Sequence, residues 1–126
     1  MVCLDYHNKG DMMTDLQIAW IAGWLEGEGY FALRGTRKQY ATVVVDSVDE
    51  DTIRKAHTLT GVGNVYGPYT RKNPGNKQPL WKWAITAHGD AISLMEQVLP
   101  HMSSRRARQI RAVLQRPTQL APTQGS

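Results

Sequence analysis

Residues 14–29 read TDLQIAWIAGWLEGEG, and this stretch predicts a helix with its start marked in the sequence. Thr14 can accept a hydrogen bond from the first free backbone N–H groups, and Gln17 three residues later can bond back to it, which is the capping-box spacing. Small residues then recur at intervals of three and four, so they share one helical face. They are Ala19, Ala22, Gly23 and Gly27. Glycine inside a helix costs roughly 1 kcal/mol relative to alanine, so this face is expected to meet a second backbone closely.

Two acids, Glu26 and Glu28, stand at the C-terminal end of this predicted helix. The helix dipole is already negative there, and an acid at that end is unfavourable by a few tenths of a kcal/mol. Acidic side chains placed where they reduce stability suggest a ligand that needs negative charge, such as a divalent metal ion.

The length and composition of the chain are those of a single, mildly basic globular domain. The chain has 126 residues, which is the size of one domain able to bury a core. Lysine and arginine exceed aspartate and glutamate by 15 to 11, a net charge of +4; this mild excess fits a nucleic-acid partner but is common in other proteins. The single cysteine, Cys3, excludes an internal disulfide. No apolar run is long enough to span a membrane and no signal peptide is recognisable, so we expect an intracellular protein.

After the first helix the apolar pattern changes to period two, which predicts strands. Strands are expected at 30–36, 40–46, 64–69 and 80–86, and helices at 49–60, 89–99 and 103–115. The order α-β-β-α-β-β-α-α predicts an α+β fold with two hairpins in one antiparallel sheet and the helices on one face. Residues 1–13 are expected to form an N-terminal arm, 14–115 the domain, and 116–126 a flexible tail.

Residues 21–29, IAGWLEGEG, resemble the signature of the LAGLIDADG homing endonucleases in its variant ending Gly-Glu-Gly. The two hairpins and the basic helix after Pro100 extend the resemblance over residues 14–115. The resemblance implies a site-specific double-strand DNA endonuclease whose saddle-shaped sheet lies over the major groove. It also implies that a chain with one motif acts as a homodimer, joined through the small-residue face, and cuts a palindromic or near-palindromic site.

The resemblance also assigns roles within the implied active site. The last acid of the motif, Glu28, is the implied metal ligand, with Mg²⁺ as the expected ion and Mn²⁺ able to substitute. Carboxylate oxygens suit Mg²⁺, and one carboxylate per chain leaves coordination to be completed by the second chain and the DNA phosphates. Arg105, five residues after Pro100, is the implied cation beside the scissile phosphate. Asp46 or Ser47, at the end of the second strand, is the implied holder of the attacking water. Glu26 is expected to serve helix-end solvation or a dimer contact.

DNA contacts are expected from the polar face of the sheet and from the hairpin loops. Arginine and lysine can reach guanine edges or phosphates, and threonine and tyrosine can bond either. The expected contacts are Tyr30, Ala32, Arg34, Thr36, Arg37, Lys38, Tyr40, Thr42, Tyr66, Arg71, Lys72 and Lys82.

A different class of function stays open at this point. The same scaffold could bind nucleic acid without cutting it, as an intron RNA maturase or a transcription regulator. An acid at position 28 favours cleavage, because a carboxylate near phosphates hinders binding alone.

Overall fold

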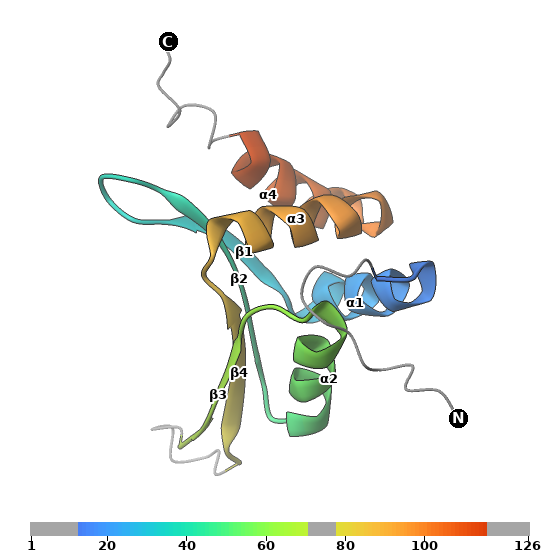
Figure 1. Ribbon diagram of the computed structural model, residues 1–126, viewed down its shortest axis with the longest axis vertical. Coiled ribbons are helices and arrows are strands. Elements are labelled where there is room, and N and C mark those ends of the chain that lie inside the picture. The colour runs from blue at the N-terminus through green and yellow to red at the C-terminus, as the bar shows by residue number, and fades with distance from the viewer. Residues whose placement is uncertain (1–12, 71–77, 116–126) are drawn as a thin grey trace.

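The computed structural model describes residues 13–70 and 78–115, and these form one layer of helices on one antiparallel sheet (Figure 1). The elements follow the order α1 (Asp15–Glu28), β1 (Tyr30–Arg34), β2 (Tyr40–Ser47), α2 (Glu50–Thr60), β3 (Asn64–Tyr69), β4 (Leu80–Ile85), α3 (His88–Val98), a 3-10 turn η1 (Leu99–His101) and α4 (Ser104–Gln115). The predicted α+β order is confirmed, with bounds that differ from the expected ones by one or two residues.

The sheet order is β1-β2-β4-β3, with every neighbouring pair antiparallel. Each hairpin keeps its own strands together, and the two hairpins meet where Val43 of β2 pairs with Ile85 of β4. The second strand of each hairpin is therefore central and the first strand is an edge. Among residues 13–70 and 78–115, the helices all lie on one side of the sheet, and no helix covers the opposite side, which is called the bare face below (Figure 1).

α1 begins with the predicted capping box. The Thr14 hydroxyl accepts a hydrogen bond from the Gln17 backbone N–H at 3.2 Å, and the Gln17 side chain accepts one from the Thr14 N–H at 2.9 Å. The helix ends at Glu28, and the backbone of Gly29 is already extended. A Cβ at Gly29 would lie 2.9 Å from the Leu25 carbonyl oxygen, so only glycine allows this loop-free passage from helix to strand.

The core lies between the sheet and the helix layer. Its largest fully buried side chains include Trp83 of β4, Ile21 and Leu25 of α1, Ile53 of α2 and Met95 of α3. Trp24 of α1 packs its ring against Trp83, with the centroids 5.9 Å apart. Met13, directly before the cap of α1, is buried as well.

The capping box should contribute measurably to stability. Replacing Thr14 by alanine removes the acceptor for the Gln17 N–H and is expected to lower the free energy of unfolding by about 1 kcal/mol. Urea denaturation followed by circular dichroism measures this. Thr14→Ser retains the hydroxyl and should stay close to the parent, so equal losses in both variants would contradict the capping role.

Candidate active site and nucleic-acid interface

The C-terminal end of α1 brings Glu26 and Glu28 to one corner of the bare sheet face. β1 starts immediately after Gly29, and its first residue Tyr30 pairs with Val44 of β2. Glu28 lies two residues before Tyr30, and Asp46 lies two residues beyond Val44 in the opposite strand. The antiparallel register therefore puts Glu28 and Asp46 at the same end of the sheet.

Glu26 connects α1 to α4. One of its carboxylate oxygens accepts a hydrogen bond from the Ser103 backbone N–H at 2.9 Å, and the other accepts one from the Ser103 hydroxyl at 2.6 Å. Ser103 directly precedes α4, where the helix dipole favours negative charge. Glu26 was expected to serve helix-end solvation or a dimer contact; instead of solvation alone, its carboxylate makes two hydrogen bonds within the chain, and the dimer contact stays a prediction.

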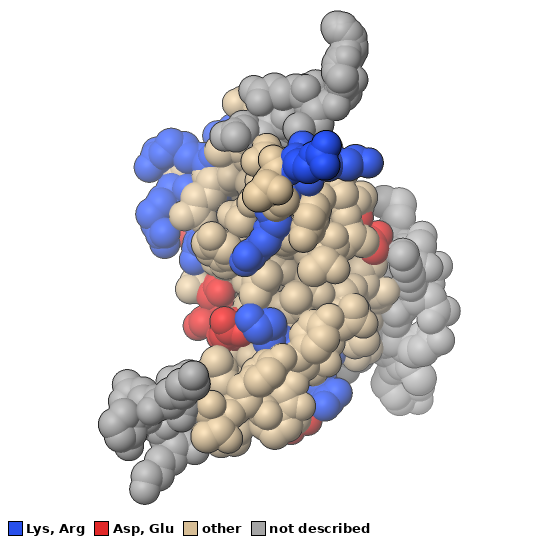
Figure 2. Space-filling view, turned by 90° about the vertical axis from the view of Figure 1, so that its left-hand side faces the viewer, with Lys and Arg blue, Asp and Glu red and all other residues tan. Residues whose placement is uncertain are grey.

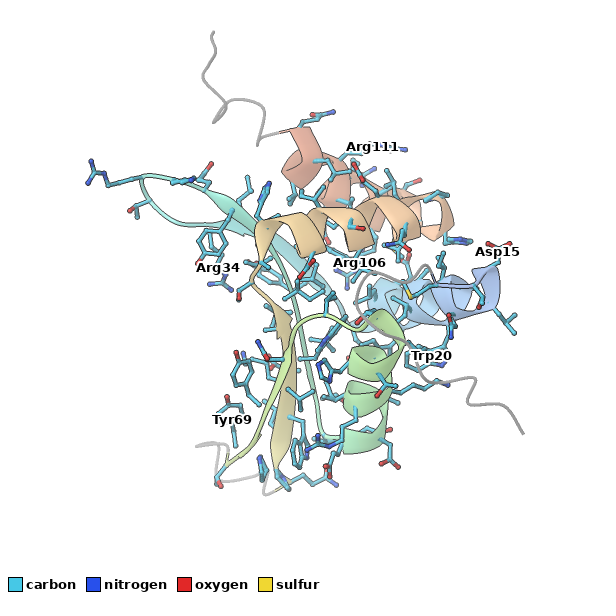
Figure 3. All side chains as sticks on the ribbon, viewed as in Figure 1. Asp15, Trp20, Arg34, Tyr69, Arg106 and Arg111 are labelled. Carbon is cyan, nitrogen blue, oxygen red and sulfur yellow. The ribbon has the colours of Figure 1, made fainter. Side chains whose placement is uncertain are left out.

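Arg106 completes this connection from the first turn of α4. Arg106 is 8% exposed, and its Nε donates to the backbone carbonyl of Glu26 at 2.8 Å. A second nitrogen of the same group donates to the Gln109 side chain at 2.9 Å. Figure 3 shows Arg106 directed from α4 toward α1. Arg106 thus fixes the start of α4 against the end of α1, a role that its position in a run of arginines did not reveal.

The Ser103 side-chain and backbone hydrogen bonds lower the pKa of Glu26. Desolvation opposes this shift, and the positive charges of Arg106 and Arg105 contribute further to lowering the pKa. Arg105 is exposed, and its predicted place beside the scissile phosphate stays a prediction.

Glu28 differs from Glu26 in its surroundings. It is exposed at the last position of α1. Within residues 13–70 and 78–115, no side chain or backbone group forms a hydrogen bond or ion pair with its carboxylate, and no three histidine, cysteine, aspartate or glutamate side chains gather into a metal cluster. The described part of one chain thus presents Glu28 without a partner and without a complete set of metal ligands.

The two candidates for positioning water are engaged elsewhere in the structure. Asp46 pairs with Lys82 across β2 and β4, with 3.3 Å between carboxylate and ammonium. The Ser47 hydroxyl accepts a hydrogen bond from the Asp49 N–H at 3.0 Å, and Asp49 in turn caps α2. Both side chains lie at the Glu28 end of β2, so the role in holding water stays a prediction for either.

The bare face of the sheet carries most of the predicted DNA contacts. Tyr30, Arg34, Tyr40 and Tyr66 are exposed there, and so is Tyr69, which the sequence analysis did not single out. Arg34 and Tyr69 project to the side away from the helices (Figure 3). On this face, acidic and basic side chains meet near the middle and further basic side chains lie above them (Figure 2).

The remaining predicted contacts have different surroundings. Ala32 and Lys82 are half-buried on the sheet, and Thr36, Arg37 and Lys38 lie exposed in the loop between β1 and β2. Thr42 was predicted as a contact, but its side chain is only 1% exposed and cannot reach DNA. Neighbouring side chains on the sheet cover it because threonine is short. Arg71 and Lys72 lie outside the described residues.

The small-residue face of α1 is mostly open. Ala19, Gly23 and Gly27 are exposed, and a Cβ built on either glycine meets no atom within 4 Å. Leu16, one turn earlier, is 82% exposed. Ala22 was predicted to belong to this face, but it is 1% exposed and packs into the core, because the helix turns it toward the sheet.

Comparison with solved structures identifies the fold. The homing endonuclease I-CvuI, solved in complex with an I-CreI target, matches with a TM-score of 0.66 and 18% identity over 86% of this chain and 69% of its own. The archaeal intron-encoded homing endonuclease I-Vdi141I, complexed with DNA, matches with a TM-score of 0.62 and 14% identity over 84% and 69%. The LAGLIDADG meganuclease I-AabMI, bound to uncleaved DNA, matches with a TM-score of 0.63 and 14% identity over 80% of this chain and 35% of its own.

The chain therefore has the fold of the LAGLIDADG homing endonucleases, as its motif predicted. No protein-family model matches the sequence, and no curated protein does. Among the described helices, none is both long and apolar enough to cross a membrane.

The Glu26 connection makes stability depend on pH. Because the pKa of Glu26 is lowered in the folded state, ionised Glu26 stabilises the fold above its ordinary value of 4.5, and this contribution is lost as pH falls through the folded pKa. We expect Glu26→Gln to be less stable than the parent at pH 7, with the difference shrinking below pH 4.5. Urea denaturation between pH 3 and 7 measures it.

Ser103→Ala is the matched partner variant, since it removes the hydroxyl that contributes most to the shift. When Glu26→Gln is introduced into Ser103→Ala, the resulting loss of unfolding free energy at pH 7 should be smaller, and so should its change with pH. A difference that stays constant from pH 7 to pH 3 would contradict the assignment.

Proposed function

We propose that the chain is a LAGLIDADG-type DNA endonuclease that acts as a homodimer and cleaves both strands of a palindromic or near-palindromic site with a divalent metal ion. The proposal is carried by the Glu28 carboxylate, which is exposed and has no partner among residues 13–70 and 78–115. Glu28 follows the open small-residue face of α1 and, with only Gly29 between them, precedes the strand that begins the tyrosine- and arginine-bearing face of the sheet. The fold and the nine-residue motif support the same reading.

The glycines of α1 support the dimer. Each costs roughly 1 kcal/mol of helix stability relative to alanine, and neither Gly23 nor Gly27 meets a neighbour that would require glycine. A second copy packed along Ala19, Gly23 and Gly27 would explain these glycines, because residues with a small side chain or none let two helix backbones approach closely. Exposed Leu16 would be covered by the same contact. Such a two-fold interface brings the two Glu28 carboxylates together, since both follow Gly27 directly.

Glu28 fits a divalent ion by the chemistry of its donors. Mg²⁺ is commonly held by one or two carboxylates together with substrate phosphates and water. Two Glu28 side chains, one from each copy, would supply those carboxylates, and the bound DNA the phosphates. When bound, the ion would activate water and stabilise the departing oxygen. Complexes of I-CvuI with its targets were solved in the presence of Mg or Ca.

The other residues act on the phosphate and on the DNA. Arg105 would place positive charge near the phosphate as negative charge develops on it, and the contact of Glu26 with Ser103 and Arg106 holds α4 in that position. Asp46 would orient a water molecule once DNA attracts Lys82 away from it. Arg34, Tyr40 and Tyr66 would contact base edges, while Arg37 and Lys38 would contact phosphates.

The catalytic role of Glu28 can be separated from DNA binding. Glu28→Gln retains the shape of the side chain but removes its charge, so it should still bind the target and should lose roughly 100-fold or more of its Mg²⁺-dependent cleavage, because a catalytic metal contributes several kcal/mol. The target comes from cleavage of a randomised double-stranded DNA library with Mg²⁺, and gel assays then follow nicking and binding.

Glu96→Gln, an exposed acid on α3, is the matched control and should cleave normally. Full cleavage by Glu28→Gln would overturn the mechanism. Specific DNA or RNA binding without cleavage by the parent chain would favour a maturase or regulator instead.

The dimer has its own test. Gly23→Leu places a side chain on the open face of α1, so the fold should persist while the mass in solution falls from two chains to one and double-strand cleavage is lost. Light scattering or analytical ultracentrifugation measures the mass. Gly89→Leu makes the same change at a glycine of α3 that also has open space around it, and it should leave the dimer intact. A parent chain that is strictly monomeric and still cuts both strands would refute the shared site.

A further inference from the structure

The β1–β2 hairpin extends beyond the rest of the sheet. β4 pairs with β2 only from Ser47 back to Val43, whereas β1 continues to pair with β2 as far as Arg34 and Tyr40. Figure 1 shows this hairpin projecting past the other strands, beside the first turn of α3. A two-stranded ribbon on its own is marginally stable in water. The projecting part therefore needs support from outside the sheet.

That support comes from a side chain at the start of α3. By the β2–β4 register, Ala41 would face residue 87, but the chain leaves the sheet after Ile85 and turns into α3. The imidazole of His88 takes the vacant acceptor position: its Nδ1 accepts a hydrogen bond from the Ala41 backbone N–H at 2.8 Å. Ala41 is fully buried, and a buried N–H without an acceptor is costly.

The chemistry of this contact is specific. A ring nitrogen that accepts a hydrogen bond carries no proton, so the proton of the neutral ring is on Nε2. His88 belongs to a helix whose Ala91, Leu94 and Met95 are buried in the core. The imidazole thus links the backbone of the projecting hairpin to a helix that is anchored in the core.

We propose that His88 is a positioning residue for the DNA-contacting hairpin, acting through the Ala41 backbone. This inference rests on the proposed function, because the hairpin matters for recognition only if the bare face binds DNA. Ala41 is adjacent to Tyr40, and Tyr40 pairs with Arg34. Both side chains are exposed on the bare face. Fixing Ala41 therefore fixes the direction in which Arg34 and Tyr40 point, without His88 touching DNA.

The first arm of the test needs no DNA. Amide hydrogen exchange of Ala41 is compared by NMR in the parent, His88→Leu and His88→Asn. Leucine has no acceptor, so Ala41 should exchange at least about fivefold faster. The Oδ1 of asparagine occupies nearly the place of Nδ1, so His88→Asn should restore much of the protection. His57→Leu on α2 is the matched control and should leave Ala41 unchanged.

The second arm measures base selectivity with a randomised double-stranded DNA library. Arg34→Ala first identifies the target positions read by the β1–β2 hairpin, and Tyr66→Ala those read by β3. His88→Leu should relax selectivity at the Arg34 positions and leave the Tyr66 positions as in the parent. His88→Asn should recover the lost selectivity. If His88→Leu does not fold, His88→Gln serves, since its longer side chain displaces the acceptor.

The outcomes separate this inference from the function on which it rests. Unchanged Ala41 exchange in His88→Leu, or equal loss of selectivity at all target positions, would overturn the role of His88 and leave the endonuclease proposal intact. Absence of sequence selectivity in the parent chain would overturn the endonuclease proposal and the DNA part of this inference together. If His88→Leu loses selectivity only at the positions read by Arg34, and His88→Asn recovers it, His88 is established as a positioning residue.

Discussion

The hydrogen bonds between the Glu26 carboxylate and Ser103 connect the C-terminal end of α1 to the N-terminal end of α4, and the candidate site depends on this connection. α1 ends at this point, β1 begins there, and α4 starts against it. An acid at the C-terminal end of α1 is unfavourable by itself, but the same acid at the N-terminal end of α4 is favourable. The N-terminal end of α4 therefore stabilises Glu26 at its position, and the hydrogen bonds to Glu26 in turn fix where α4 begins.

Glycine 29 makes this corner compact. With the Leu25 carbonyl oxygen 2.9 Å from the place a Cβ would occupy, helix and strand join without a loop. Glu26 and Glu28 consequently stand at the edge of the sheet rather than on a flexible connection. Rigid support of this kind is what a catalytic carboxylate needs, because small displacements of a reacting group greatly reduce rate.

Much of this arrangement could be predicted from sequence because it is local. The capping box depends on Thr14 and Gln17 alone, and the strands follow from period-two patterns such as residues 40–46. The contributions of Glu26, Arg106 and His88 could not be predicted, since each depends on a partner more than 40 residues away in the chain. The same limit explains Thr42 and Ala22: periodicity assigned them to a face, but only the packed neighbours determine that they are covered.

The two acids of the motif, Glu26 and Glu28, are two residues apart but have different surroundings. Each carboxylate oxygen of Glu26 accepts a hydrogen bond from Ser103, so this side chain holds the end of α1 against the start of α4. Glu28 is exposed and unpaired within the described part of the chain, so its charge is available. An unpaired carboxylate facing bound phosphates would repel them, and this repulsion is removed if a cation lies between the two. A cation between Glu28 and the DNA would remove this repulsion, and the proposed metal-dependent cleavage rests on that argument.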